Sequence, residues 1–188
     1  ASLTYQKNHR LLIAIFDTLL KNSRIPAELK LVLVGEGPEK ESLERQCASL
    51  GLKYWDFQNE KDKSAAQVVF LGFQANPYPL LRHAQLLVMT SLWEGLPIAL
   101  LEAMALGVPS VVSDCSAGIG EAFGLRIDEI EQLSACGVVQ ASAGMLVTKP
   151  MDADPSTVVI WEKVISQVLL DVNYRKSCSN KAPLQAAE

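Results

Sequence analysis

Hydrophobic and polar positions follow two different periods along the chain. Between residues 7 and 21, apolar side chains recur at three- and four-residue spacing, which predicts a helix with one face against a sheet. Elsewhere, short continuous apolar runs are bounded by Gly, Pro or Asn, a pattern typical of buried strands. The runs predicted to form strands are 29–34, 68–73, 85–90 and 109–112, with 138–147 returning to the sheet.

Helix start and stop residues lie between the apolar runs. Asp154 followed by Pro155 is predicted to begin a helix whose apolar stripe continues to Leu169. The other predicted helices are one carrying Leu43, Cys47 and Leu50 that Gly51 closes, one starting at Asn76-Pro77, one over 97–106 that Gly107 ends, and a short one within 118–137. The polar stretch 58–65 is predicted as a surface loop, and the tail 172–188 is expected to fray.

The alternation of strands and helices predicts an α/β fold. We expect a Rossmann-like, doubly wound parallel sheet with helices on both of its faces. No internal repeat or low-complexity linker divides the chain, so residues 1–188 are expected to form a single domain. A doubly wound domain normally opens with a strand, whereas this chain opens on a loop and a helix. We therefore expect the first strand of the domain to be missing.

The charge balance and the cysteine pattern argue against several classes of function. With 17 basic and 21 acidic residues the net charge is -4, which does not favour a nucleic-acid partner. The four cysteines are scattered without a CxxC pair or a neighbouring histidine, so we expect no metal site and a reducing compartment. No apolar stretch approaches the length of a bilayer span, so any membrane association is expected to be peripheral or through sequence outside the chain.

Candidate chemistry is concentrated in the segment 91–105, which follows a predicted buried strand and opens a helix. In open α/β sheets, ligands bind at this carboxyl edge of the strands. Gly95 lets a ligand approach the backbone closely, and the free amides at the start of the Pro97 helix attract an anion such as a diphosphate. The segment is therefore a candidate binding site for a phosphorylated ligand.

Two carboxylates, Glu94 and Glu102, stand on either side of this helix start. Glu102 lies in the second turn on an apolar segment, where a carboxylate is costly without hydrogen-bond partners, and its side chain leans back toward the helix N-terminus. A ribose suits that acceptor, and Glu94 could accept bonds from a sugar beyond the phosphates. Spacing alone leaves an equal alternative, in which Glu94 is a solvated loop residue and Glu102 pairs with a nearby lysine or arginine.

The segment EGLPIALLEAMALGVPSVVSD, with seven residues between Glu94 and Glu102, resembles the E-x7-E motif of retaining glycosyltransferases of the GT-B fold. It most resembles glycosyltransferase family 4. Further likeness lies at 35–38, 69–73, 76–78 and 143–147, in the order that the family shows, so the resemblance covers nearly the whole chain. The resemblance implies the C-terminal, donor-binding half of such an enzyme.

This resemblance implies roles for individual residues. Glu102 would contact the ribose of the donor, and the catalytic residues would be Glu94 on the transferred sugar and Lys7 on the diphosphate. Ser2 stands where the family has an arginine. The main chain at 70–73 would face the base, although Phe70 and Phe73 fit equally well as core residues. The donor-binding residues implied besides Glu102 are Gly95, Leu96, Pro97, Ile98, Gly35, Gly37, Phe70, Leu71 and Gly72.

The implied function is transfer of a sugar, with retention, from a nucleoside diphosphate sugar to a saccharide or lipid-linked acceptor in glycan biosynthesis. A UDP-sugar is the preferred donor, no cofactor or bound metal is expected, and the acceptor would bind a missing N-terminal domain in the cytoplasm or at the cytoplasmic face of a membrane. Because Ser2 replaces the arginine of the family, an alternative stays open in which the chain is a noncatalytic lobe that binds a nucleotide sugar or a partner protein. A nucleotide-sugar epimerase or a phosphorylase is a less favoured alternative.

Overall fold

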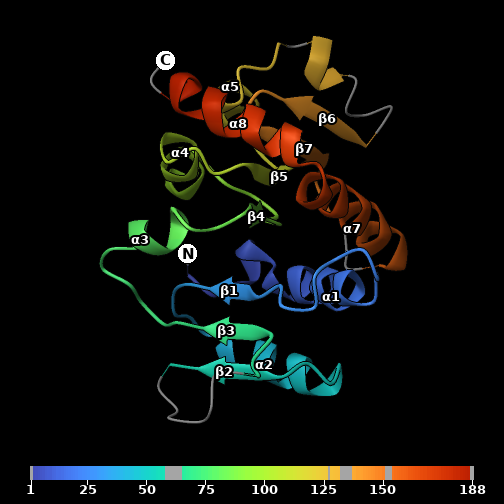
Figure 1. Cartoon of the computed structure of the whole chain (residues 1–188). Helices are drawn as coiled ribbons and strands as arrows, with labels where there is room; N and C mark the ends of the chain where they lie inside the picture. The colour runs from blue at the N-terminus through green and yellow to red at the C-terminus, as the bar shows by residue number, and fades with distance from the viewer. Residues whose placement is uncertain (1, 58–64, 127, 132–136, 151–153, 187–188) are drawn as a thin grey trace.

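The computed structural model describes residues 2–57, 65–126, 128–131, 137–150 and 154–186, so the predicted loop 58–65 lies almost entirely outside the described residues. Strands and helices alternate along the chain, and Figure 1 shows the helices flanking the strands. The elements of the N-terminal half are η1 (Tyr5–Lys7), α1 (His9–Leu20), β1 (Leu31–Leu33), α2 (Lys40–Ser49), β2 (Tyr54–Asp56), β3 (Val68–Phe70), α3 (Tyr78–Leu81) and β4 (Leu87–Met89). Those of the C-terminal half are α4 (Ile98–Ala105), β5 (Ser110–Asp114), α5 (Ala117–Ala122), β6 (Val138–Ala141), β7 (Gly144–Thr148), α7 (Pro155–Leu170) and α8 (Val172–Gln185). The predicted α/β class is confirmed.

The described strands form two sheets and not the single sheet that was expected. Strands β1, β3 and β2 pair in parallel in that order. Strands β4, β5 and β7 also pair in parallel, and β6 lies on the outer edge antiparallel to β7. Both β1 and β4 are edge strands, and in Figure 1 these two edges face each other with the N-terminal segment between them. The parallel pairing is thus confirmed everywhere except at β6.

The run 138–147 forms a hairpin of two strands. Strand β7 begins at Gly144, where an added Cβ would come within 1.8 Å of the Ser110 carbonyl oxygen. Only glycine lets β7 approach β5 this closely, because any side chain there would overlap the neighbouring backbone. The apolar pattern located the strand pair but gave no sign of its turn.

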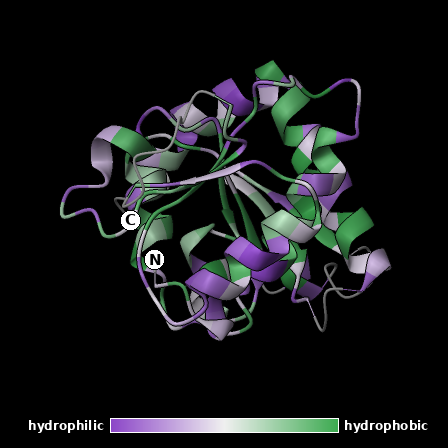
Figure 2. Ribbon diagram, turned by 90° about the horizontal axis from the view of Figure 1, so that it is seen from below, coloured by the Kyte–Doolittle hydropathy of each residue, from purple (hydrophilic) through white to green (hydrophobic). Residues whose placement is uncertain are grey.

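Apolar side chains of the strands and the helices pack together in the core, and Figure 2 shows hydrophobic residues along the central strands. Helix α1 buries Leu11, Ile15 and Phe16, which confirms its predicted stripe. Helix α7 packs on α1 through Trp161 and its neighbours. The predicted cap of α7 is also confirmed, because the Asp154 carboxylate accepts hydrogen bonds from two first-turn amides.

Residues 172–185 of the C-terminal tail form helix α8, so the expectation that these residues fray was wrong. Helix α8 packs on α4, and its Cys178 and Ala182 are fully buried. The Tyr174 hydroxyl donates to the Gly144 carbonyl at 2.7 Å, which ties α8 to the sheet. Strand β2, at Tyr54–Asp56, was not predicted, because its three residues carry no apolar run that would distinguish it from a loop.

Candidate functional site

The N-terminal loop crosses the carboxyl end of β1 and is held there by backbone contacts. The Leu3 amide donates to the Glu36 carbonyl at 2.8 Å, and the Leu3 carbonyl accepts from the Glu39 amide at 3.0 Å. A Cβ on Gly37 would lie 2.3 Å from the Leu3 carbonyl oxygen, so the loop fits only because residue 37 is glycine. The predicted glycine turn therefore holds the N-terminal loop in place.

The other side of the same loop is bound to the segment that follows β4. The Leu92 amide donates to the Gln6 carbonyl at 2.8 Å, and the Gln6 side chain returns a bond to the Trp93 carbonyl at 2.7 Å. The buried Thr90 hydroxyl donates to the Asn8 carbonyl at 3.0 Å. The loop thus connects the two sheets at their carboxyl ends, where ligands bind in open α/β folds.

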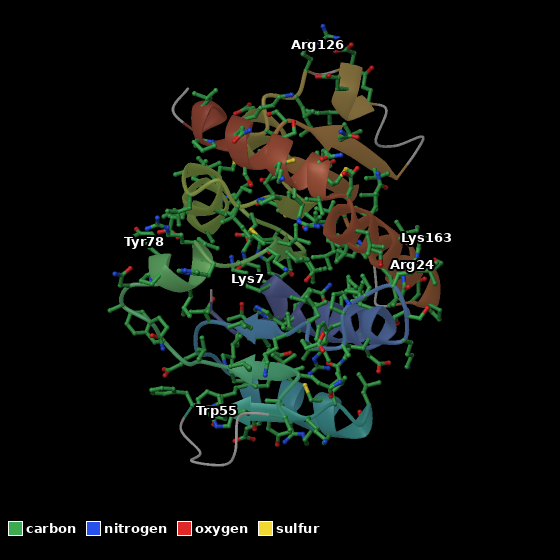
Figure 3. The ribbon with its side chains drawn as sticks, in the orientation of Figure 1. Lys7, Arg24, Trp55, Tyr78, Arg126 and Lys163 are labelled. Carbon is green, nitrogen blue, oxygen red and sulfur yellow. The ribbon has the colours of Figure 1, made fainter. Side chains whose placement is uncertain are left out.

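These contacts bring Lys7 to Glu94. The Lys7 Nζ lies 2.5 Å from Glu94 Oε1, and the side chains are 19% and 6% exposed. The Ser91 hydroxyl donates to the same oxygen at 2.7 Å. Glu94 is therefore a nearly buried carboxylate with a cation and a hydroxyl as partners, and the alternative that it is a solvated loop residue is wrong. Figure 3 shows Lys7 in the centre of the molecule, between the two sheets.

Helix α4 begins at Ile98, four residues after Glu94, and its N-terminus has no side-chain cap. Pro97 occupies the cap position and has no side chain that could accept a bond from the first amides. Leu96 and Ile98, on either side of it, are exposed. Gly95 lies close to α5, because the Ser116 hydroxyl donates to the Gly95 carbonyl at 2.7 Å. No side chain therefore caps the start of α4, and the anion expected there stays a prediction.

Glu102 lies half-buried in the second turn of α4, and its partner is a tyrosine. The Tyr78 hydroxyl donates to Glu102 Oε1 at 3.1 Å. This bond raises the pKa of the Tyr78 phenol, because ionisation would place a second negative charge beside the carboxylate. The expected hydrogen-bond partner of Glu102 therefore exists, and it belongs to α3 and not to a lysine or arginine.

Gly35 and Gly72 form a bridge between the loops that follow β1 and β3, with the Gly35 amide donating to the Gly72 carbonyl at 2.8 Å. The carbonyls of Phe70 and Leu71 also accept bonds within the protein. Phe70 itself is 1% exposed and belongs to the core, whereas Phe73 is exposed. A base at this edge would therefore meet main-chain carbonyls that each already accept one hydrogen bond.

Other features of the described residues lie outside this constellation. Two surface cavities, of about 420 and 570 Å³, lie elsewhere, the first beside Asn22 and Glu162 and the second beside Leu106 and Lys176. Within the described ranges no group of three His, Cys, Asp or Glu residues gathers to hold a metal ion. In the same part of the chain no helix combines the length and apolar character needed to cross a bilayer.

Sequence reasoning missed three residues of this site. Ser91 opens the candidate segment 91–105 and Tyr78 ends the segment 76–78 that carried the family resemblance, but neither received a role. Gln6 gave no signal, because its contribution depends on a segment 87 residues away. Partners of a predicted carboxylate can be sought among hydroxyl residues in the neighbouring loops, and that rule would have found Ser91.

Comparisons with known proteins agree with this arrangement. The sequence model of the family described as glycosyl transferases group 1 matches residues 1–133. A glycosyltransferase of Methanocaldococcus jannaschii is 35% identical over 116 residues, which are 62% of this chain and 25% of that protein. An N-acetylgalactosaminyltransferase of Campylobacter jejuni is 31% identical over 118 residues, which are 63% of this chain and 27% of that protein. Its name gives a diphospho-undecaprenol acceptor and a 4-alpha linkage.

A solved structure shares the fold. The crystal structure of the pneumococcal O-GlcNAc transferase GtfA in complex with UDP and GlcNAc superimposes with a TM-score of 0.73 at 17% identity, over 99% of this chain and 31% of that one. The chain spans only about a quarter of the length of the two curated relatives.

Proposed function

Because the chain belongs to the glycosyl transferases group 1 family, we propose that it is the donor-binding lobe of an enzyme that transfers a sugar from a nucleoside diphosphate sugar in glycan biosynthesis. Its fold is the Rossmann-like, C-terminal half of a GT-B glycosyltransferase. The observation that carries the proposal is the ion pair of Lys7 with Glu94 beside the open start of α4. A cation, a carboxylate and free helix amides are the groups that a sugar diphosphate requires.

Each group has a role in the proposed reaction. The diphosphate lies at the start of α4, where the helix dipole and the first amides attract negative charge. Lys7 turns from Glu94 to the diphosphate and stabilises the negative charge that develops on it as its bond to the sugar breaks. Glu94, released from Lys7, accepts hydrogen bonds from hydroxyls of the transferred sugar. Glu102 accepts hydrogen bonds from the ribose.

What the similar proteins bind supports a proposal for the donor and the acceptor. We propose a UDP-sugar as donor, because the crystal structure of GtfA contains UDP. A saccharide or lipid-linked acceptor agrees with the diphospho-undecaprenol named for the Campylobacter enzyme. Transfer with retention and a cytoplasmic site of action, in part at the membrane face, complete the proposal by resemblance to the same family.

We also propose that polypeptide outside this chain supplies the first strand and the acceptor site. Strands β1 and β4 are both sheet edges, so a parallel strand between them would join the two sheets into one. Leu3 lies at the carboxyl end of β1, which is where such a strand would end. The relatives are about four times as long as the part that this chain matches, which leaves room for an acceptor domain.

One observation favours a second candidate function. Ser2 is exposed at the position where the family has an arginine for the diphosphate, so Lys7 is the cation of this loop that lies at the site. With one cation in place of two, the leaving diphosphate is less stabilised. A noncatalytic lobe that binds a nucleotide sugar is therefore the alternative.

The test is calorimetric titration of the chain with UDP, GDP and ADP. Glu102→Ala should weaken the binding of the preferred nucleotide by about 1 to 3 kcal/mol, because the ribose hydroxyls lose a hydrogen-bond acceptor. Glu41→Ala, on the exposed face of α2, is the matched control and should leave affinity unchanged. Equal affinity of Glu102→Ala and the unmodified chain would refute the ribose assignment.

Turnover separates the two candidates. In the full-length enzyme, Glu94→Gln should abolish transfer while nucleotide affinity is kept. A full-length protein that binds the nucleotide sugar and transfers nothing to any acceptor would support the noncatalytic lobe.

A further inference from the structure

Tyr78 makes a contact that connects two separate elements of the proposed donor site. It is the first residue of α3, and its hydroxyl donates to Glu102 of α4, 24 residues further along the chain, at 3.1 Å. Figure 3 shows Tyr78 on α3, with α4 next to it. The phenol therefore binds the one carboxylate to which the proposed function assigns the ribose.

The backbone around Tyr78 fixes where its ring can lie. The Tyr78 amide donates to the Asn76 side-chain oxygen at 3.2 Å, and the Tyr78 carbonyl accepts from the Arg82 amide at 2.9 Å. Pro77 precedes it and Pro79 follows it, and each proline restricts its own φ angle. A ring mounted on so restrained a backbone can hold a flexible partner in one orientation.

The ring contributes little to the core. Tyr78 is 48% exposed, and α3 carries no buried side chain. A tyrosine retained for folding would be expected to bury its ring, since the large apolar area is what stabilises the native state. The phenol hydroxyl donates its hydrogen bond to Glu102, and the loss of this bond should leave the fold intact.

We propose that Tyr78 is a positioning residue that holds the Glu102 carboxylate in the orientation that accepts the vicinal hydroxyls of a ribose. The inference rests on the proposed function, because it takes Glu102 as the ribose acceptor. A free glutamate side chain has several rotamers to lose when a ligand binds. Because Tyr78 holds Oε1, the Glu102 side chain has lost this rotamer freedom before the nucleotide binds. Oε2 keeps both of its lone pairs for the ribose.

The experiment is a double-mutant cycle read by calorimetric titration with UDP. Tyr78→Phe keeps the ring and removes only the hydroxyl, so its UDP affinity should fall roughly threefold to tenfold, as for one lost hydrogen bond. In the Glu102→Ala background the same substitution should have no further effect, because the group that it positions is absent. Tyr54→Phe, at an exposed tyrosine of β2, is the matched control and should bind UDP like the unmodified chain.

A second ligand gives a readout that a merely structural role would not move. With 2′-deoxy-UDP the effect of Tyr78→Phe should shrink, because one of the two hydroxyls that need the oriented carboxylate is gone. Unchanged UDP affinity in Tyr78→Phe, or an equal loss with and without Glu102, would overturn the inference while the ribose assignment stands. If Glu102→Ala binds UDP normally, or if the chain binds none of UDP, GDP and ADP, the proposed function fails and the inference fails with it.

Discussion

Replacement of Lys7 by methionine tests whether the ion pair with Glu94 holds the two loops of the site together. The pair is short, at 2.5 Å, and its side chains are only 19% and 6% exposed. Methionine keeps most of the aliphatic stem of lysine, so little packing is lost. The Glu94 carboxylate stays in place, with the Ser91 hydroxyl still donating to it.

The magnitude follows from the cost of an unpaired buried charge. Removing one partner of a buried pair typically costs about 3 to 5 kcal/mol. A hydrogen bond to a charged group contributes roughly 1.5 to 3 kcal/mol, so the Ser91 hydroxyl should offset a part of that loss. We expect Lys7→Met to lower the free energy of unfolding by about 2 to 4 kcal/mol, a large share of the stability of a typical domain.

The assay is urea unfolding of the unmodified chain, Lys7→Met, Glu94→Gln and the double variant. The double variant should be more stable than Lys7→Met alone, because it buries no charge. Lys163→Met, at an exposed position of α7, is the control. A loss below about 0.5 kcal/mol for Lys7→Met, or single losses that simply add in the double variant, would refute the reasoning.

Gly37→Ala should displace the N-terminal loop and lower UDP affinity, because the new Cβ would lie 2.3 Å from the Leu3 carbonyl oxygen. Gly51→Ala is the control: its left-handed φ of 73° strains the backbone at the end of α2, but no atom lies within 4 Å of the new Cβ, so UDP affinity should stay normal. Burial lowers the pKa of His9 from 6.5 to about 4. Between these pH values the unfolded chain binds a proton at His9 that the folded chain does not, so the free energy of unfolding should fall by up to roughly 3 kcal/mol as the pH drops through this window. His9→Gln should flatten this part of the curve of unfolding free energy against pH. An unchanged curve would exclude His9 as the cause of the pH dependence. Ala182→Asp should lower the midpoint temperature of unfolding, because it buries an unpaired charge in the contact of α8 with the core. An unchanged midpoint, measured by circular dichroism, would argue that α8 detaches easily from the core.

Local patterns were enough to predict the elements that have strong periods or caps. The stripe of α1 and the cap at Asp154 are properties of short stretches, and both are confirmed. Helix α8 was missed because its fully buried residues, Cys178 and Ala182, are small and do not stand out as an apolar stripe. Its order comes from packing on α4, which a single segment cannot reveal.

The part of the candidate site that lies in one continuous segment was predictable, whereas the contacts between segments were not. The segment with Glu94 and Glu102 is continuous, so its position after a strand and before a helix could be read directly. The partners of the two carboxylates lie elsewhere in the chain, with Lys7 on the N-terminal loop and Tyr78 on α3. Neither contact follows from spacing, because each depends on how the loops at the carboxyl ends of different strands come together.

The N-terminal loop also bears on the order in which the molecule folds. Its bonds reach from Leu3 to Glu36 on one side and across 87 residues from Gln6 to Trp93 on the other. Contacts of such long sequence separation carry a large loop-closure cost and need both sheets as a template. The two carboxyl edges should therefore form first and the loop should close over them last. Amide hydrogen exchange at Leu92, which donates to Gln6, would follow that final step. The stability of the core and the integrity of the binding edge are then two separate quantities, and a chain can lose the second while it keeps the first.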